Sequence, residues 1–168
     1  MTELITEKAK KIRALFLDVD GVLTNGSFAL TAEGTEIKQF HTHDGYGLKQ
    51  LQQQGIVVAI ISSRNSQAVT YRMQELNISH VYQGVATKIS IYEKLLLDLK
   101  LNDEQIAYMG DDIPDLAILK RVGLSIAPAN AVTEVKQNTA WVTQRSGGQG
   151  AVREVCDFIL AARQCIFN

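Results

Sequence analysis

The sequence predicts an α/β fold, in which helices cover both faces of a parallel sheet. Two observations support this fold class. Short apolar runs bounded by Gly, Ser, Asp or Pro recur along the chain, and segments of helical periodicity separate them. Strands that alternate with helices are typical of a three-layer, Rossmann-like parallel sheet. The length of 168 residues suits one domain with a sizeable core, so we expect residues 1–168 to form a single domain.

The expected elements follow from the apolar pattern. The predicted strands are residues 14–17, 57–61, 106–109 and 124–126. The predicted helices are residues 44–53, 66–76, 88–99, 115–122 and 151–165. Residues 88–99 give the clearest helical pattern, because their apolar side chains fall on one stripe. Asn102 and Gln105 resemble a capping box before another short turn.

One region breaks the alternation of strands and helices. Residues 27–30 and 36–40 alternate apolar and polar side chains around Ala32-Glu33-Gly34. This pattern predicts a β-hairpin at about residues 27–40, directly after the first strand. A C-terminal segment and helix at about residues 146–168 complete the chain.

Charge and cysteine usage limit the possible partners and compartment. The formal net charge of -1 gives no basic field, so we expect neither nucleic acid nor a membrane surface as partner. Residues 1–13 lack the apolar core of a signal peptide, and no apolar run approaches the roughly 20 residues of a membrane span. Cys156 and Cys165 lie nine residues apart on one predicted helix, too far apart to pair. Reduced thiols indicate a cytoplasmic protein.

Polar side chains follow the predicted strands at the edge where ligands bind in open α/β sheets. They are Asp18, Asp20, Ser62, Ser63, Arg64, Asp111, Asp112 and Asp115, with Lys88 at the start of a helix. Several carboxylates without histidine or cysteine favour Mg²⁺ over zinc. A lysine and a hydroxyl can hold a phosphoryl group, and a carboxylate beside a metal can attack phosphorus. The sequence therefore predicts a Mg²⁺-dependent phosphatase.

Three of these residues have distinct expected roles. Asp18 is the predicted nucleophile, and Mg²⁺ together with Lys88 would neutralise its repulsion from a phosphate dianion. Asp20, two residues later, could protonate the leaving oxygen and then deprotonate water.

In order along the chain, these residues resemble the four motifs of the haloacid dehalogenase superfamily. The motifs are Asp18-Val19-Asp20-Gly21-Val22-Leu23-Thr24, Ser62, Lys88 and Gly110-Asp111-Asp112-Ile113-Pro114-Asp115. The resemblance implies that Ser62 and Ser63 bind the phosphoryl group with Lys88. It implies a metal site made by Asp18, Asp111, Asp112 and the backbone carbonyl of Asp20, with Asp115 in support. Ser63 stands where the family usually has glycine.

Many members of the superfamily carry a cap domain that selects the substrate. The stretches from Asp20 to Ser62 and from Ser62 to Lys88 are already used by predicted elements. Independent domains need roughly 50 residues or more, so we expect no cap domain. An open site of this kind would need a neighbouring subunit to exclude water.

Finer details resemble cap-less phosphatases of 3-deoxy-D-manno-octulosonate 8-phosphate, which serve lipopolysaccharide biosynthesis. They are the segments 18–26, 40–41, 44–47, 64–66 and 147–154, together with Gly84 and Lys88. The resemblance implies a homotetramer, with the hairpins at its centre and the C-terminal segment near a neighbour's site. It also implies substrate contacts from Asn25, His41, Arg64 and Arg153, of which Arg64 suits a carboxylate. His43 stands where this family usually has arginine.

Several alternatives remain at this point. The substrate could instead be a nine-carbon sugar acid 9-phosphate, or the domain could be a receiver-like phosphoaspartate signalling module. Residues 147–150 could cradle an anion or form a mobile tail. Asp111 and Asp112 could simply cap the following helix. Arg153 could make a surface salt bridge rather than a substrate contact.

Overall fold

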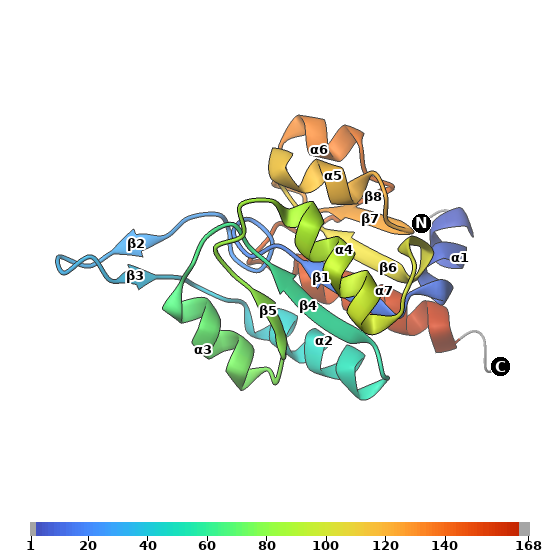
Figure 1. The fold of residues 1–168 in the computed structure, drawn as a ribbon, viewed down its shortest axis with the longest axis horizontal. Helices are drawn as coiled ribbons and strands as arrows, with labels where there is room; N and C mark the ends of the chain where they lie inside the picture. The colour runs from blue at the N-terminus through green and yellow to red at the C-terminus, as the bar shows by residue number, and fades with distance from the viewer. Residues whose placement is uncertain (1–2, 165–168) are drawn as a thin grey trace.

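The computed structural model of the chain describes residues 3–164, and it contains a six-stranded parallel sheet and a two-stranded hairpin (Figure 1). The sheet order is β5-β4-β1-β6-β7-β8. The strands are β1 (Ala14–Leu17), β2 (Ala29–Leu30), β3 (Glu36–Ile37), β4 (Val57–Ile61), β5 (His80–Tyr82), β6 (Ile106–Met109), β7 (Leu124–Ala127) and β8 (Trp141–Val142). The α-helices are α1 (Glu3–Lys11), α2 (Thr42–Gln53), α3 (Gln67–Glu75), α4 (Lys88–Leu99), α5 (Leu116–Leu119), α6 (Thr133–Gln137) and α7 (Ala151–Gln164). Two 3₁₀ helices, η1 (Asp103–Gln105) and η2 (Ile113–Asp115), lie before and after β6.

The central strands have the bounds that the apolar runs predict. β1, β4 and β6 start and end at the predicted residues, and β7 is one residue longer than predicted. β1 lies between β4 and β6, and its last residue, Leu17, pairs with Ile60 and Met109. This register brings the residues that follow these three strands to one edge of the sheet.

Helices cover both faces of the sheet, which confirms the predicted three-layer fold (Figure 1). Side chains of α1, α2, α3 and α7 share one core with alternate strand residues such as Leu15 and Leu17. On the other face, α4, α5 and α6 pack with Phe16 and Tyr108. Trp141 packs on Phe158 with ring centroids 5.0 Å apart, and so joins β8 to α7.

The predicted helix at residues 115–122 differs from the structure. It is split into η2 and the four-residue α5, because Pro114 lies in the first turn of η2 and Asp115 turns inward, fully buried. The capping box of Asn102 and Gln105 is present, at η1. Cys165 and the rest of residues 165–168 lie outside the described residues, as does that part of the predicted C-terminal segment.

The hairpin extends away from the sheet at the end where β1 finishes (Figure 1). Its ladder is shorter than the predicted span, with Ala29 paired to Ile37 and Leu30 to Glu36. Only this hairpin and α2 lie between β1 and β4, so the cap-less architecture is confirmed. Within residues 3–164, none of the helices combines the length and the apolar character that crossing a bilayer requires.

Candidate active site

A tight turn after β1 presents the first two carboxylates. The carbonyl of Val19 accepts hydrogen bonds from the amides of Val22, Leu23 and Thr24 at 2.9–3.2 Å. Gly21 takes a positive φ of 82°, which suits glycine. Asp18 and Asp20 therefore leave the same short turn at the carboxyl edge of the sheet.

Asp18 and Lys88 form a buried ion pair. Lys88 Nζ lies 2.6 Å from Asp18 Oδ2 and 2.7 Å from Asp115 Oδ1. The other oxygen of Asp18 accepts the backbone amide of Val19 at 2.6 Å. Lys88 is the first residue of α4, and its side chain is only 4% exposed. The lysine therefore fixes the orientation of the Asp18 carboxylate.

Asp115 anchors the loop after β6. Its Oδ1 also accepts the hydroxyl of Tyr108 at 2.6 Å. Its Oδ2 accepts the backbone amides of Asp111 and Asp112 at 3.1 and 3.3 Å. Both oxygens are thus used inside the protein. The role of Asp115 is to hold Lys88 and the Asp111–Asp112 backbone in place.

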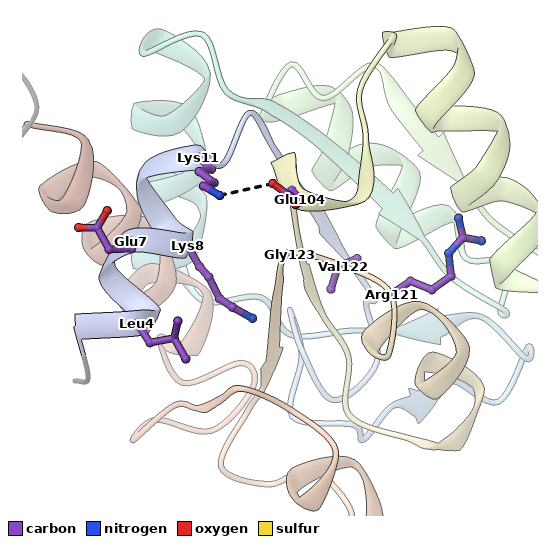
Figure 2. Close-up of a pocket in the computed structure, with 8 residues that line it drawn as sticks. All are labelled: Leu4, Glu7, Lys8, Lys11, Glu104, Arg121, Val122 and Gly123. Atoms are coloured by element: carbon purple, nitrogen blue, oxygen red, sulfur yellow. Dashed lines mark hydrogen bonds and ion pairs between the residues drawn. The ribbon is translucent and has the colours of Figure 1, made fainter.

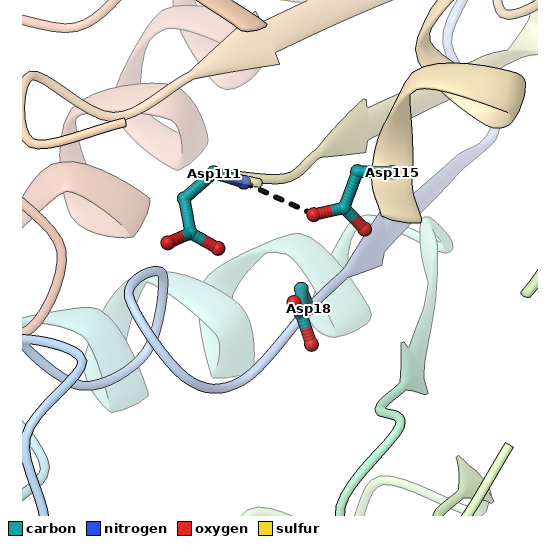
Figure 3. A group of neighbouring side chains, drawn as sticks. All are labelled: Asp18, Asp111 and Asp115. Carbon is teal, nitrogen blue, oxygen red and sulfur yellow. Dashed lines mark hydrogen bonds between the residues drawn. The ribbon is translucent and has the colours of Figure 1, made fainter. Parts of the chain in front are cut away.

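Three carboxylates lie close enough to hold a metal ion. Oxygen atoms of Asp18, Asp111 and Asp115 lie within 4.8 Å of one another (Figure 3). Because the bonds of Asp115 are already made, Asp18 and Asp111 are the stronger ligands. Gly21 gives Asp111 its space, since a Cβ there would lie 2.0 Å from Asp111 Oδ2. An oxygen-only donor set fits Mg²⁺.

The electrostatics of this group also fit a cation. Burial and the charge of Asp115 raise the pKa of Asp18 to about 6, although Lys88 opposes the shift. Burial and the charges of Asp18 and Asp115 raise the pKa of Asp111 to about 7. Burial lowers the pKa of Lys88, but the charges of Asp18 and Asp115 raise it overall. One lysine therefore does not neutralise the negative charge of these carboxylates, and a divalent cation would reduce the repulsion between them.

Asp20 has partners that the sequence analysis missed. Lys38, from the residue after β3, has a fully buried side chain and donates a hydrogen bond to Asp20 Oδ1. Arg64 Nε lies 3.7 Å from Asp20 Oδ2. Lys38 and Arg64 both contact Glu36, at 3.4 and 2.5 Å. The alternating pattern of the hairpin indicates only that Lys38 and Glu36 share one face.

Eight of the predicted site residues line one cavity of about 260 Å³. They are Asp18, Asp20, Ser62, Ser63, Arg64, Lys88, Asp111 and Asp112, joined by Gly26 and Pro114. Ser62 follows β4 and is 2% exposed, and its Oγ accepts the backbone amide of Arg64 at 3.3 Å. Asp112 Oδ1 accepts the amide of Ile113 at 2.8 Å, so it caps η2 while lining the cavity.

Three predicted substrate contacts lie outside this cavity. Asn25 Oδ1 accepts the amide of Ser27 at 2.9 Å, in a turn at the base of the hairpin. His41 is the N-cap of α2 and accepts the amide of His43 through Nδ1 at 3.2 Å. Arg153 Nε binds Asp157 at 2.7 Å on α7. Within one chain, these side chains are occupied with local structure.

The glycine segment before α7 supports the turn after β1. Gly147 donates its amide to Asn130 Oδ1 at 2.6 Å, and Asn130 Nδ2 donates to the carbonyl of Gly21 at 3.0 Å. The amide of Gly148 bonds to the carbonyl of Val22 at 3.1 Å. Residues 147–150, for which the sequence left an anion cradle or a mobile tail as alternatives, instead pack against the turn after β1.

A larger cavity, of about 380 Å³, lies at the opposite edge of the sheet (Figure 2). Its walls come from α1 and from the segments that precede β6 and β7, and Lys11 and Glu104 face each other across it at 3.4 Å. Ligands of open α/β sheets bind at the carboxyl ends of strands. The smaller cavity, which holds the carboxylates, is therefore the candidate active site.

Comparison with known proteins shows the family of this chain. Residues 78–155 match the family described as haloacid dehalogenase-like hydrolase. The 3-deoxy-D-manno-octulosonate 8-phosphate phosphatase KdsC of Yersinia pestis is 42% identical over 159 residues, which cover 95% of this chain and 85% of that protein. A crystal structure of the Y. pestis phosphatase has a TM-score of 0.97 at 40% identity, and the match covers 100% of this chain and 91% of that one.

The corresponding phosphatase of Moraxella catarrhalis, solved with magnesium ion, phosphate ion and KDO, has a TM-score of 0.94 at 39% identity. That match covers 99% of this chain and 98% of the Moraxella chain. The chain therefore belongs to the haloacid dehalogenase-like hydrolases, in the family of the 3-deoxy-D-manno-octulosonate 8-phosphate phosphatases.

Proposed function

We propose that this chain is a Mg²⁺-dependent phosphatase that converts 3-deoxy-D-manno-octulosonate 8-phosphate into the free sugar acid and phosphate for lipopolysaccharide biosynthesis. The observation that carries the proposal is the buried Asp18–Lys88 pair, 2.6 Å long, at a cavity that Arg64 also lines. A carboxylate fixed by a lysine can attack phosphorus, and the guanidinium can bind the carboxylate of a sugar acid. The Moraxella relative, which binds magnesium, phosphate and KDO, supports this substrate.

The reaction takes two steps on the side chains of the turn. Asp18 attacks phosphorus, the bond from phosphorus to the sugar oxygen breaks, and Asp20 gives that oxygen a proton. Water then attacks phosphorus, Asp20 takes its proton, and the bond to Asp18 breaks to release phosphate. Lys88 and Ser62 hold the phosphoryl oxygens during both steps.

Asp18 and Asp111 would hold Mg²⁺, with Asp112 nearby and the backbone carbonyl of Asp20 as a further oxygen donor. When bound, the ion supplies positive charge beside the transferred phosphoryl group. Asp115 holds these groups in place through its bonds to Lys88 and to the backbone amides of Asp111 and Asp112.

The nucleophile assignment is tested by Asp18→Asn. An amide is a poor nucleophile, so phosphate release from octulosonate 8-phosphate should fall by about a thousandfold or more. Asp98→Asn is the matched control, because Asp98 lies exposed on α4 and, among residues 3–164, forms an ion pair only with Lys94, at 3.4 Å. Substantial turnover by Asp18→Asn would contradict the assignment.

The substrate is tested by comparing eight-carbon and nine-carbon sugar acid phosphates in the same assay. We expect a higher kcat/KM for the eight-carbon substrate. A preference for the nine-carbon 9-phosphate would replace the proposed substrate while keeping the phosphatase. A phosphoaspartate that persists without release would instead favour the signalling alternative.

We also propose that residues 1–168 act as one domain and assemble as a cytoplasmic homotetramer. The hairpin supports the assembly, since Phe28, Leu30 and Ile37 are 44%, 63% and 55% exposed on it. Cys156 supports the compartment, because it is a free, buried thiol. In such an assembly, Asn25, His41 and Arg153 would be available to a neighbour's site.

A further inference from the structure

Three groups hold the guanidinium of Arg64 in one position. Nη2 donates to Glu36 Oε2 at 2.5 Å. Nε lies 3.7 Å from Asp20 Oδ2. The ring of Phe28 lies under the group, with Cζ 4.2 Å from the ring centroid. Two of the three partners, Phe28 and Glu36, belong to the hairpin, so the hairpin sets where this arginine points.

Part of the guanidinium stays available. Among the residues that the structure describes, Nη1 of Arg64 has neither a hydrogen bond nor an ion pair. The side chain lines the active-site cavity and is 48% exposed. An arginine offers five N–H donors in a planar fork, so Arg64 can bind a further carboxylate without releasing Glu36 or Asp20.

We propose that Glu36 is a positioning residue for substrate choice. It holds Arg64, with help from Phe28, so that the free donors take the carboxylate of the sugar acid. This inference rests on the proposed function. Fixing a long side chain before binding removes an ordering cost, and so strengthens binding of the acid.

The charges around Glu36 allow it to stay in place when a second carboxylate arrives. The Ser66 hydroxyl, followed by the hydrogen bond from Arg64 and the charge of Lys38, lowers the pKa of Glu36 to about 2, so Glu36 is ionised at neutral pH. Lys38 Nζ lies 3.4 Å from Glu36 Oε1 and also bonds to Asp20. Glu36 thus keeps Lys38 as a second cationic partner when Arg64 also binds the substrate.

A rival role for Glu36 makes the opposite prediction. Glu36 could occupy the place of the substrate carboxylate and compete with it for Arg64. Removing its charge would then improve binding of the acid substrate. Under the positioning role, the same change loosens Arg64 and weakens that binding.

The test compares Glu36→Gln with wild type on octulosonate 8-phosphate and on arabinose 5-phosphate, which has no carboxylate. We expect the ratio of kcat/KM for the acid to that for the neutral sugar to fall about tenfold, which corresponds to roughly 1.4 kcal/mol. This decrease in the ratio should come from a higher KM for the acid substrate. Glu33→Gln is the matched control, since Glu33 is exposed at the tip of the same hairpin.

Phe28→Leu is a second variant, and it should reduce the same ratio because it removes the surface under the guanidinium. The melting temperature of each variant should be measured to check that the variant is folded. A ratio that stays the same or rises in Glu36→Gln overturns the positioning role. A wild-type enzyme that shows no preference for the acid substrate overturns the proposed function instead, because the preference itself would be missing.

Discussion

Asp18 and Asp111 share one counter-charge, Lys88, in a buried site. Their pKa values rise to about 6 and about 7, above the ordinary value of 3.8. The folded protein therefore binds protons at these groups more tightly than the unfolded chain does. The stabilisation that they contribute is fully present below about pH 4 and is lost as the pH rises through 6 to 7.

This loss of stability at higher pH predicts how Mg²⁺ should change the melting temperature. The ion competes with protons for the carboxylates, so it should raise the melting temperature more at about pH 8 than at about pH 5. Because pH 5 lies one unit below the Asp18 pKa of about 6, proton competition at Asp18 should weaken the magnesium effect there by roughly 1.4 kcal/mol, or about 3–6 °C. Thermal melts with and without magnesium chloride measure the difference. Asp18→Asn should reduce this pH dependence. An equal magnesium effect at both pH values in the wild-type protein would contradict the prediction.

The sequence showed most of the cavity residues but missed two of their partners. Lys38 lies in a hairpin whose inward face depends on how the hairpin meets the sheet, and alternation alone does not identify the buried side. Tyr108 lies within an apolar strand, where the pattern indicates only core. Its hydroxyl reaches Asp115 because η2 turns that carboxylate inward. Both contacts depend on tertiary packing.

Central strands and long helices were predictable because burial leaves a pattern in them. β1, β4 and β6 are four or five apolar residues each, almost wholly buried. The elements that the sequence analysis missed leave less pattern: β5 has three half-buried residues, and β8 has only two residues, of which Trp141 is buried and Val142 exposed. α1 buries only Ala9 among its nine residues, so its mostly polar sequence gave no apolar stripe.

The glycine segment before α7 should matter for catalysis as well as for folding. A Cβ at Gly147 would lie 1.8 Å from the carbonyl oxygen of Gly21, so Gly147→Ala must displace the turn that carries Asp20. A displacement of about 1 Å can cost about a hundredfold in rate, and we expect a loss of that order in kcat. Steady-state kinetics and melting curves measure the two effects.

Gly55→Ala is the control for this substitution. Gly55 has a φ of 74° and open space around its Cβ position, so alanine there brings only backbone strain of about 1–2 kcal/mol. We expect a lower melting temperature with kcat kept. If Gly147→Ala also kept its kcat, the segment would serve stability alone.

Residues 3–164 form no cap domain, and the hairpin extends from the end of the sheet that carries the candidate active site (Figure 1). The arms of the hairpin expose the apolar side chains of Phe28, Leu30 and Ile37, which water solvates poorly. A symmetric assembly would bury them and enclose the substrate at the same time. The proposed tetramer thus connects substrate enclosure with oligomeric state.

Leu30→Glu tests this assembly. Leu30 is 63% exposed, and a charge there would be repeated in every subunit at a shared apolar contact. We expect the molar mass by light scattering to fall from four times the 18.5 kDa chain toward that of a single chain. Leu97→Glu is the control, since Leu97 is 79% exposed on α4, away from the hairpin. An unchanged mass for Leu30→Glu would remove the hairpin from the interface.

The central position of β1 also decides when the site can form as the chain is synthesised. Asp18 leaves the ribosome early, but the strands on either side of it, β4 and β6, come much later, and Lys88 and Asp111 come with the second half of the chain. A nascent chain therefore carries the proposed nucleophile, Asp18, without Lys88 and without the proposed metal ligand Asp111. Phosphatase activity can appear only after Asp115 has emerged and docked, so a truncated translation product would be inert.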